Sequence, residues 1–238
     1  MNYLLSLLVL ITITARAEDK TFTGETEASA VLISGNANNE TYSAKTKNTY
    51  AISQSDLATI FGKYIRGVSA GTENTKAWEA GLRYERVFTK DLFSGFLQQK
   101  VEHDPYNGIF IQRDSSDVGV KYTIEKTDYL NWFAEFGYRY QRTYAAMETG
   151  YENADFLRIY TEGEYKLSPT ATAKLWLEHL PNLKRPKESQ SNGEASLSVA
   201  ISNIFSLKTA YLVNHNEAIL SPGKKDTTTW TTALVAKY

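Results

Sequence analysis

The chain has 238 residues but contains no cysteine and only five prolines, and neither charge is in excess. The absence of cysteine excludes a disulfide framework and thiolate chemistry, although it does not argue against an oxidising compartment. The 26 basic and 27 acidic residues give a net charge of −1, so nucleic acid is not expected as a partner. The sequence has no glycine-rich loop for phosphate or dinucleotide binding, because Gly35 starts a Gly-Asn turn that is typical of a hairpin.

Long apolar runs are also absent after residue 17. Residues 3–13 are apolar, and they are followed by the small-x-small site Ala15-Arg16-Ala17. The run is too short to span a bilayer as a helix and ends in a cleavage-site pattern, which predicts a secretory signal peptide over residues 1–17. No Pro- or Ser-rich linker divides residues 18–238, so we expect them to form one barrel domain.

What the sequence has in abundance is tyrosine, with 16 residues, and stretches that alternate between apolar and polar side chains. The last stretch, TTTWTTALVAKY, places Trp230, Leu234 and Tyr238 on one face and Lys237 on the other. An apolar face that ends on an aromatic residue suits the closing strand of an outer-membrane barrel, although a strand in a soluble sandwich can have the same pattern. We predict that Trp230, Leu234 and Tyr238 form a C-terminal signal through which the barrel-assembly machinery binds this strand.

Turn signals divide the mature chain into twelve segments with period-two alternation. The predicted strands are residues 22–32, 41–52, 57–68, 76–88, 92–101, 109–125, 129–142, 156–167, 171–180, 194–201, 205–213 and 227–238. The connections alternate between longer and shorter ones, with residues 69–75 among the longer loops. Because outer-membrane barrels have short periplasmic turns and longer external loops, we predict an all-β protein, an antiparallel up-and-down transmembrane β-barrel of about 12 strands with both termini periplasmic.

The two faces of these segments differ in character. One face carries mostly Trp, Tyr, Leu, Val and Ile, whereas the other carries about ten residues of each charge. Such a wide row of large apolar residues would overfill a small barrel core, so we expect the apolar face to meet lipid and the charged face to line the lumen. The central charges expected to set the behaviour of the lumen are Arg83, Glu85, Lys121, Glu135, Arg139, Arg158, Glu162 and Lys174. For residues 57–68 the sequence does not show which face meets lipid, because both faces carry large apolar residues. Phe61 and Ile65 lie on one face, and Ile60 and Tyr64 lie on the other.

Six segments together cover most of the mature chain and resemble one known family. They are SGNANNETYSAKTKNTY (34–50), GLRYERVFTKDLFSGFLQQKVEHDPYNG (81–108), DVGVKY (117–122), FLRIYTEGEYKLSPTATAKLWLEHLPNL (156–183), FSLKTAYLV (205–213) and DTTTWTTALVAKY (226–238). They are similar to the salt-induced outer-membrane proteins of Gram-negative bacteria. The resemblance implies an outer-membrane location among lipid and lipopolysaccharide and a connection with salt stress. It implies no catalytic or ligand-binding residues.

Two functions follow from the lumen and the loops. The first is a small-solute or ion pore of low selectivity, because lumen charges of both signs can pair across strands and narrow the bore. The second is a structural or surface-interaction barrel with a plugged lumen. In that case the loop 181–193 would offer Lys184, Arg185 and Lys187 to the phosphates of lipopolysaccharide.

An enzyme acting on outer-membrane lipid is the third alternative, and it would need a nucleophile, a base and an orienting group. His179 precedes a loop with Ser189, Ser191 and Asn192, but serine and asparagine are common in such loops. The consecutive residues 102–104, Glu-His-Asp, do not impose the geometry of a metal site. We therefore predict no catalytic residue, no metal site and no cofactor.

Overall fold

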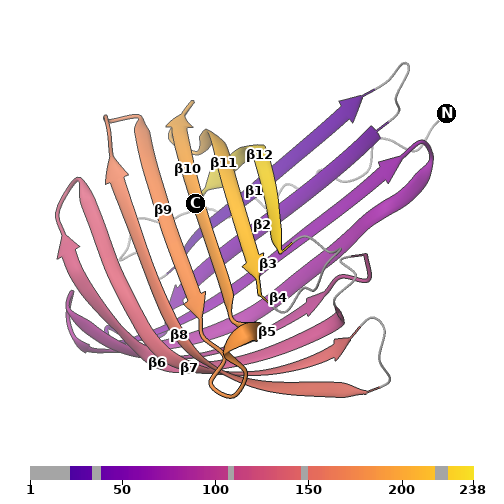
Figure 1. Cartoon of the computed structure of the whole chain (residues 1–238). Coiled ribbons are helices and arrows are strands. Elements are labelled where there is room, and N and C mark those ends of the chain that lie inside the picture. Colours follow the sequence, from indigo (N-terminus) through magenta and orange to yellow (C-terminus); the bar gives the residue numbers. More distant parts are fainter. Residues whose placement is uncertain (1–21, 34–38, 107–109, 146–149, 218–224) are drawn as a thin grey trace.

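The chain forms a closed β-barrel in the computed structural model, which describes residues 22–33, 39–106, 110–145, 150–217 and 225–238 (Figure 1). Each strand pairs antiparallel with its neighbours in sequence, and β1 closes the sheet against β12. The strands are β1 (Phe22–Ile33), β2 (Asn39–Ala51), β3 (Asp56–Ser69), β4 (Thr72–Thr89), β5 (Phe93–His103), β6 (Phe110–Lys126), β7 (Leu130–Ala145), β8 (Tyr151–Lys166), β9 (Ala171–Leu180), β10 (Gln190–Ala200), β11 (Phe205–Asn216) and β12 (Asp226–Lys237). The predicted 12-stranded up-and-down barrel is confirmed, while the predicted signal peptide lies outside the described residues.

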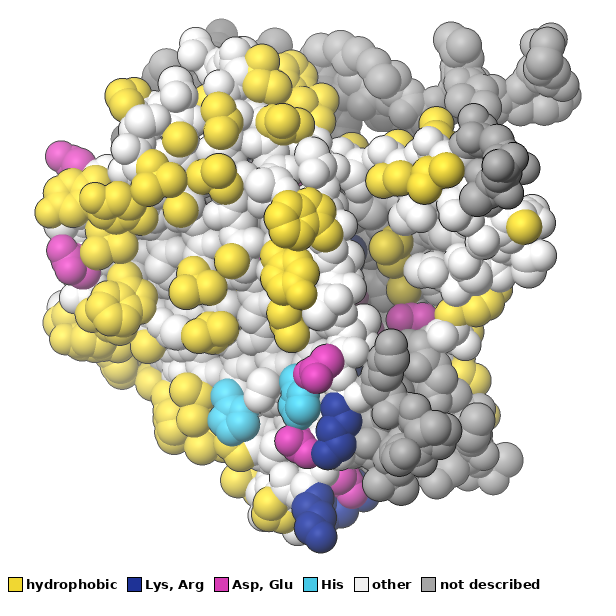
Figure 2. All heavy atoms as spheres, turned by 45° about the horizontal axis from the view of Figure 1, so that its top comes forward, with side chains coloured by type: hydrophobic (Ala, Val, Ile, Leu, Met, Phe, Trp, Pro, Cys, Tyr) yellow, Lys and Arg dark blue, Asp and Glu magenta, His cyan; other side chains and the backbone are white. Residues whose placement is uncertain are grey.

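Apolar side chains cover the outer wall of the barrel. On β7, for example, Trp132, Phe136 and Tyr138 alternate with Glu135 and Arg139. The three aromatic residues are exposed, with Phe136 at 56%, whereas each of the two charged residues is only 4% exposed. Figure 2 shows a broad hydrophobic surface on one side of the barrel, with histidine and charged side chains gathered at its lower edge. This inside-polar, outside-apolar arrangement is the reverse of a soluble barrel and suits a lipid-facing wall.

Strand β3, whose phase was open, directs Ile60 and Tyr64 outward and buries Thr59 on the opposite face. Phe61 therefore shares the inner face, where it lies directly opposite Gly81 on β4. A Cβ atom at Gly81 would lie 2.2 Å from the Phe61 ring, so the missing side chain leaves room for an aromatic residue inside the barrel. The local pattern is ambiguous because both faces of β3 carry apolar residues.

The two ends of the barrel have different connections, as expected, but one prediction about them is wrong. Residues 69–75 are not a long loop, because β3 ends at Ser69 and β4 begins at Thr72. Ala70 and Gly71 form the turn with φ of 48° and 81°, which is the two-residue geometry that matches the twist of a hairpin. Strands β8 and β10 also begin earlier than predicted, at Tyr151 and Gln190, since their polar first residues continue the ladder.

The connection between β9 and β10 contains a single turn of 3-10 helix, η1 (Pro186–Glu188). Among the described residues no helix has the length and apolar character needed to cross a membrane.

The barrel closes over a short seam at the end where the chain termini lie. Four residues of β1, from Glu25 to Ala28, pair with β12, whereas β1 and β2 pair over twelve positions. Tyr238 extends the seam, because its backbone N–H and C=O bond to Gly24 at 3.0 and 2.8 Å. The Tyr238 hydroxyl lies 2.9 Å from Asn48 Oδ1, and its ring stacks on Phe22 at 5.9 Å. The last residue of the chain therefore fastens the first strand to the last.

Candidate functional site in the barrel lumen

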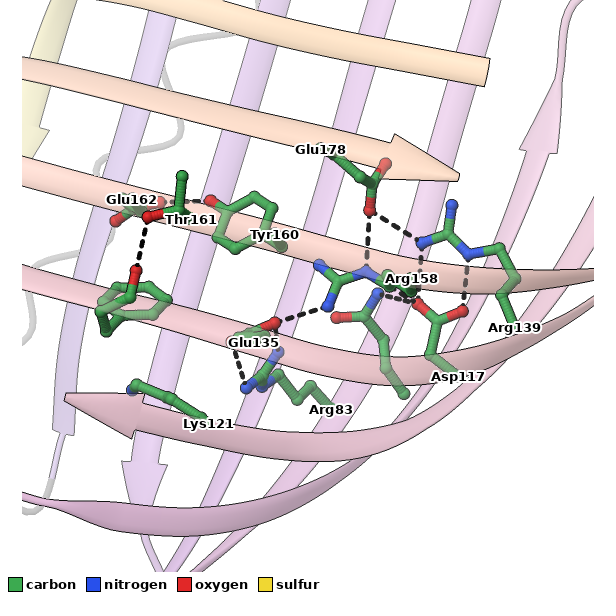
Figure 3. A network of polar contacts seen from close by, with 12 residues as sticks. Arg83, Asp117, Lys121, Glu135, Arg139, Arg158, Tyr160, Thr161, Glu162 and Glu178 are labelled. Carbon is green, nitrogen blue, oxygen red and sulfur yellow. Dashed lines mark hydrogen bonds and ion pairs between the residues drawn. The ribbon is translucent and has the colours of Figure 1, made fainter. Parts of the chain in front are cut away.

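The eight predicted lumen charges all lie on strands of one half of the barrel, β4 and β6 to β9, and each takes part in an ion pair. Figure 3 shows four of them, Arg83, Glu135, Arg139 and Arg158, gathered with Asp117 and Glu178 on the inner side of the wall. Six of them join Asp117 of β6 and Glu178 of β9 in a continuous set that we call the lumen network. Its members are Arg83, Glu85, Asp117, Lys121, Glu135, Arg139, Arg158 and Glu178. The other two, Glu162 and Lys174, form a separate pair at 2.8 Å.

Arg158 lies at the centre of the lumen network. Its Nη1 donates to Glu135 Oε2 at 2.5 Å, and its Nε donates to Glu178 Oε1 at 2.8 Å. Arg139 contacts the same Glu178 carboxylate at 3.2 Å and binds both oxygens of Asp117 at 2.6 and 2.8 Å. The Glu178 carboxylate thus accepts hydrogen bonds from arginines on two strands, β7 and β8. The two-bond Arg139–Asp117 contact fixes the orientation of both side chains.

The network continues from Glu135 to β4. Arg83 donates to both oxygens of Glu135, at 2.8 and 3.2 Å, and to Glu85 Oε2 at 2.9 Å. Glu85 also accepts from Lys121 at 3.2 Å and from the Ser94 hydroxyl at 2.7 Å. Contacts that cross several strands in this way fill the lumen on the β4–β9 side with side chains.

The lumen network is electrically balanced and largely dry. Four cations face four carboxylates, so the sum of their formal charges is zero. Asp117, Glu135, Arg139 and Arg158 are all 4–5% exposed. Burying charges costs several kcal/mol per ion, and this cost is recovered only when every charge is paired in good geometry. The network therefore narrows the lumen without giving it a field of one sign.

Two glycines and a phenylalanine make the site possible. Gly119 on β6 and Gly137 on β7 are cross-strand partners, and a Cβ at Gly119 would lie 2.6 Å from the backbone of Phe136 and 2.8 Å from the Phe96 ring. Phe96, which is 3% exposed, occupies the depression left by these glycines. The Arg83 guanidinium lies over the same ring at 4.0 Å, a cation–π contact that positions it toward Glu135.

Sequence reasoning missed three members of this site. Asp117 and Glu178 are not among the eight central charges predicted from the sequence, and Phe96 is not predicted as a site residue at all. The alternation of strands gives the face of each residue, but it does not give the depth in the barrel at which residues of different strands meet. The glycines opposite each other, at positions 119 and 137, are the signal that could have located Phe96.

A cavity of about 270 Å³ lies beside the lumen network, and we call it the lumen cavity. It is lined by residues of β1, β2 and β8 to β12: Glu25, Glu27, Lys45, Lys47, Tyr160, Glu162, Glu164, Thr172, Lys174, Trp176, Glu178, Glu194, Ser196, Ser198, Lys208, Val235 and Lys237. Glu178 belongs to both the cavity and the network. The cavity therefore extends up to the lumen network from the side of the barrel where β1 meets β12.

The three residues of the predicted C-terminal signal lie on the outer wall of β12 and at the chain end. Trp230 is 71% exposed and contacts the ring of Tyr211 at 5.9 Å, whereas Leu234 and Tyr238 are each 47% exposed. Their exposure leaves them open to a partner, and their role in assembly stays a prediction.

The residues considered for lipid hydrolysis do not form a complete catalytic set. His179 Nδ1 lies 2.8 Å from Ser191 Oγ at the loop end of the outer wall. Asn192 faces the lumen instead, where its amide donates to Glu178 at 3.2 Å, because adjacent residues of a strand point to opposite faces. The hydroxyl of Ser189 donates to the carbonyl oxygen of Pro186 within the loop. The His-Ser-Asn grouping of the alternative enzyme hypothesis is therefore not assembled.

A second histidine at this end is held by carboxylates. His215 lies 2.6 Å from Asp226 and 2.9 Å from Glu217, and Lys225 donates to Glu217 at 2.7 Å. Hydrogen bonds from Lys225 and His215 lower the pKa of the Glu217 carboxyl to about 2. These contacts tie the ends of β11 and β12 together.

The loop charges considered for lipopolysaccharide are mostly engaged within the protein. Lys184 pairs with Asp155 at 2.5 Å, and Arg185 pairs with Glu152 and with Glu188, the latter at 3.0 Å. In the described part of the chain, no group of three or more His, Asp or Glu residues is placed to hold a metal ion.

Comparison with solved structures identifies the type of barrel. The chain is similar to the NanC porin, with a TM-score of 0.54 and 8% identity over 90% of this chain and 98% of that chain. It is also similar to the COG4313 outer membrane channel from Pseudomonas putida F1, with a TM-score of 0.57 and 9% identity over 91% of this chain and 95% of that chain. At such low identity the likeness shows the fold alone. The protein thus has the fold of an outer-membrane porin and an outer-membrane channel.

Sequence comparison gives the family. Among curated proteins, no sequence matches this chain. A family model covers residues 26–238, which is nearly the whole predicted barrel domain. The chain belongs to the family described as "Protein of unknown function, DUF481".

Proposed function

We propose that this protein is an outer-membrane channel for small solutes with weak ion selectivity. The observation that carries the proposal is the inner wall: a balanced lumen network lies beside a polar cavity, inside a closed barrel with an apolar outer wall. A ring of one charge would select ions by sign, whereas a network with no net charge gives little discrimination. The fold shared with a porin and an outer membrane channel supports the same function.

The proposed location is the outer membrane of a Gram-negative bacterium, with both termini in the periplasm. An even number of strands puts the two termini at one end, where the connections 52–55, 90–92 and 127–129 are short. We propose that the outer wall contacts lipid and lipopolysaccharide, and that the barrel-assembly machinery binds β12 through Trp230, Leu234 and Tyr238. A link with salt stress follows from the family resemblance, and protein levels in cells grown at low and high NaCl test it.

A structural barrel with a closed lumen is the second candidate. The deep burial of Asp117, Glu135, Arg139 and Arg158 favours it, because side chains that water does not reach leave little room for a solute on that side. The two candidates differ in one measurable property, which is steady conductance.

Single-channel recording in a planar bilayer tests the proposed channel. The mature protein is purified from outer membranes, and current is recorded in symmetric KCl and then across a KCl gradient. We expect steady conductance steps and a reversal potential near zero, since the lumen network has no net charge. Swelling of vesicles in a neutral osmolyte measures solute passage independently of charge. A folded barrel that is silent in both assays would favour the closed structural barrel.

A further inference from the structure

We propose that the lumen cavity binds a neutral saccharide. The inference deepens the channel function proposed above and rests on it, because the ligand would be a solute that enters the lumen.

Aromatic rings form one wall of the cavity. Tyr160 on β8 and Trp176 on β9 stack with ring centroids 6.0 Å apart and planes 25° from parallel. The ring of Phe133 on β7 lies 6.0 Å from that of Tyr160 but outside the lining of the cavity. A sugar ring presents one face of C–H groups, and stacked aromatic rings offer that face an apolar surface inside an otherwise polar lumen. The hydroxyl of Tyr160 is held by Glu162 at 2.5 Å, so the platform is fixed before any ligand arrives.

Groups that hydrogen-bond hydroxyls surround the platform. Glu162 and Lys174 form an ion pair at 2.8 Å beside it, and Thr172, Ser196 and Ser198 add neutral donors and acceptors. Carboxylates accept hydrogen bonds, ammonium groups donate them, and the hydroxyl groups of a sugar do both. A few polar groups around an aromatic surface are the usual composition of a small-molecule site.

Several charged groups of the cavity are available to a ligand. Within the part of the chain that the structure describes, Glu25, Lys47, Glu164 and Lys237 have no ion-pair contact within 4.0 Å. Glu25 lies between Lys47 and Lys237 in the sheet register. Lys47 and Lys237 remain exposed to water, so their ammonium groups can exchange water for ligand hydroxyls.

The charge of the cavity argues against an ionic ligand. Its lining has six glutamates and five lysines, which leaves a net charge of −1. A polyanion loses hydration when it binds, and only an excess of cations in the lining would offset that cost. A small cation would need several carboxylates close together. A neutral polyhydroxy compound matches both the mixed charges and the aromatic platform.

Isothermal titration calorimetry of the full-length protein in detergent tests the site without requiring conduction. The probes are maltotriose as the neutral saccharide, trigalacturonate as an acidic one and glycine betaine as a zwitterion. We expect heat of binding with maltotriose alone. Trp176→Ala should weaken maltotriose binding about tenfold, or about 1.4 kcal/mol, because the stacking surface is lost. Trp176→Phe, which keeps a ring, should retain most of the affinity and shows that the site is folded.

The matched control is Trp132→Ala. Trp132 is on the neighbouring strand β7 but is 41% exposed on the outer wall, so its loss should leave maltotriose binding unchanged. Absence of binding, or equal loss in the Trp132 and Trp176 variants, would overturn the proposal. Binding of trigalacturonate or betaine in place of maltotriose would overturn the ligand class. Ion conductance recorded without any sugar decides the channel function separately, so the two failures can be told apart.

Discussion

Arg83 on β4 and Glu135 on β7 form a two-bond ion pair, at 2.8 and 3.2 Å, across the two strands that lie between them. The pair passes over the Phe96 ring, which fills the depression above Gly119. Strands three places apart can make such a contact only where the sheet curves around its inner face. The ion pair therefore links the curvature of the barrel wall to the narrowing of its lumen.

Removing the Glu135 carboxylate should destabilise the barrel. Glu135→Gln leaves Arg83 and Arg158 buried and each short of one anion, and breaking a buried ion pair in this way costs about 3–5 kcal/mol. The fall in unfolding free energy is measured by urea titration of the detergent-solubilised barrel with tryptophan fluorescence. Glu125→Gln, at an exposed position of β6, is the control and should change stability by about 0.5 kcal/mol or less. Equal effects of the two substitutions would mean that the network does not hold the barrel together.

Neutralising the arginines of the network should make the channel prefer cations. The triple variant Arg83→Gln, Arg139→Gln and Arg158→Gln leaves four carboxylates against Lys121, a local charge of −3. A lumen with excess negative charge favours cations, so the reversal potential in a KCl gradient should move toward that of K⁺.

The matched variant removes charges of the other sign from the same network. Glu85→Gln, Glu135→Gln and Glu178→Gln leave an excess of three positive charges and should move the reversal potential toward that of Cl⁻. Only variants that run as folded barrels in gel electrophoresis without heating are compared. An open channel with the same selectivity in both variants would show that ions pass by another route, along the β1 and β10–β12 side of the lumen.

The strands and their faces could be predicted from the sequence because both depend on local alternation. Trp132 and Glu135 point to opposite faces of β7, because one is at an even and the other at an odd position. Lipid favours apolar side chains on the outer face, whereas the lumen favours polar ones on the inner face. The phase of β3 could not be predicted, because Phe61 is accommodated inside the barrel by Gly81, a residue on another strand. The partners of Arg83 were also inaccessible, since they depend on curvature and on how far each strand is displaced relative to the next.

The approach of β6 to β7 depends on Gly119. Gly119→Ala would bring a Cβ within 2.6 Å of the Phe136 carbonyl oxygen and 2.9 Å of the Gly137 Cα, and backbone atoms cannot move aside cheaply. We expect a loss of about 1–3 kcal/mol in unfolding free energy, as for overpacking of a core. Gly163→Ala is the matched control, because its Cβ would meet only Trp132 at an ordinary 3.8 Å. Comparable urea midpoints for the two variants would contradict the close packing at Gly119.

Tyr238 helps to close the barrel at the seam between β1 and β12. Tyr238→Ala removes the stacking on Phe22 and the hydroxyl contact with Asn48, at the short seam between β1 and β12. The backbone contacts with Gly24 stay available, so the purified variant should refold in detergent with a lower thermal midpoint. Trp230→Ala, on β12 but outside the residues that pair with β1, should leave that midpoint nearly unchanged.

Insertion in cells separates this structural role of Tyr238 from recognition by the assembly machinery. If the machinery reads the exposed aromatic face of β12, both Tyr238→Ala and Trp230→Ala should reduce the amount of folded barrel in outer-membrane fractions, although Trp230→Ala refolds normally in detergent. Normal insertion of Trp230→Ala would limit the signal to the end of the chain. Normal insertion of both variants would exclude this face as the recognised surface.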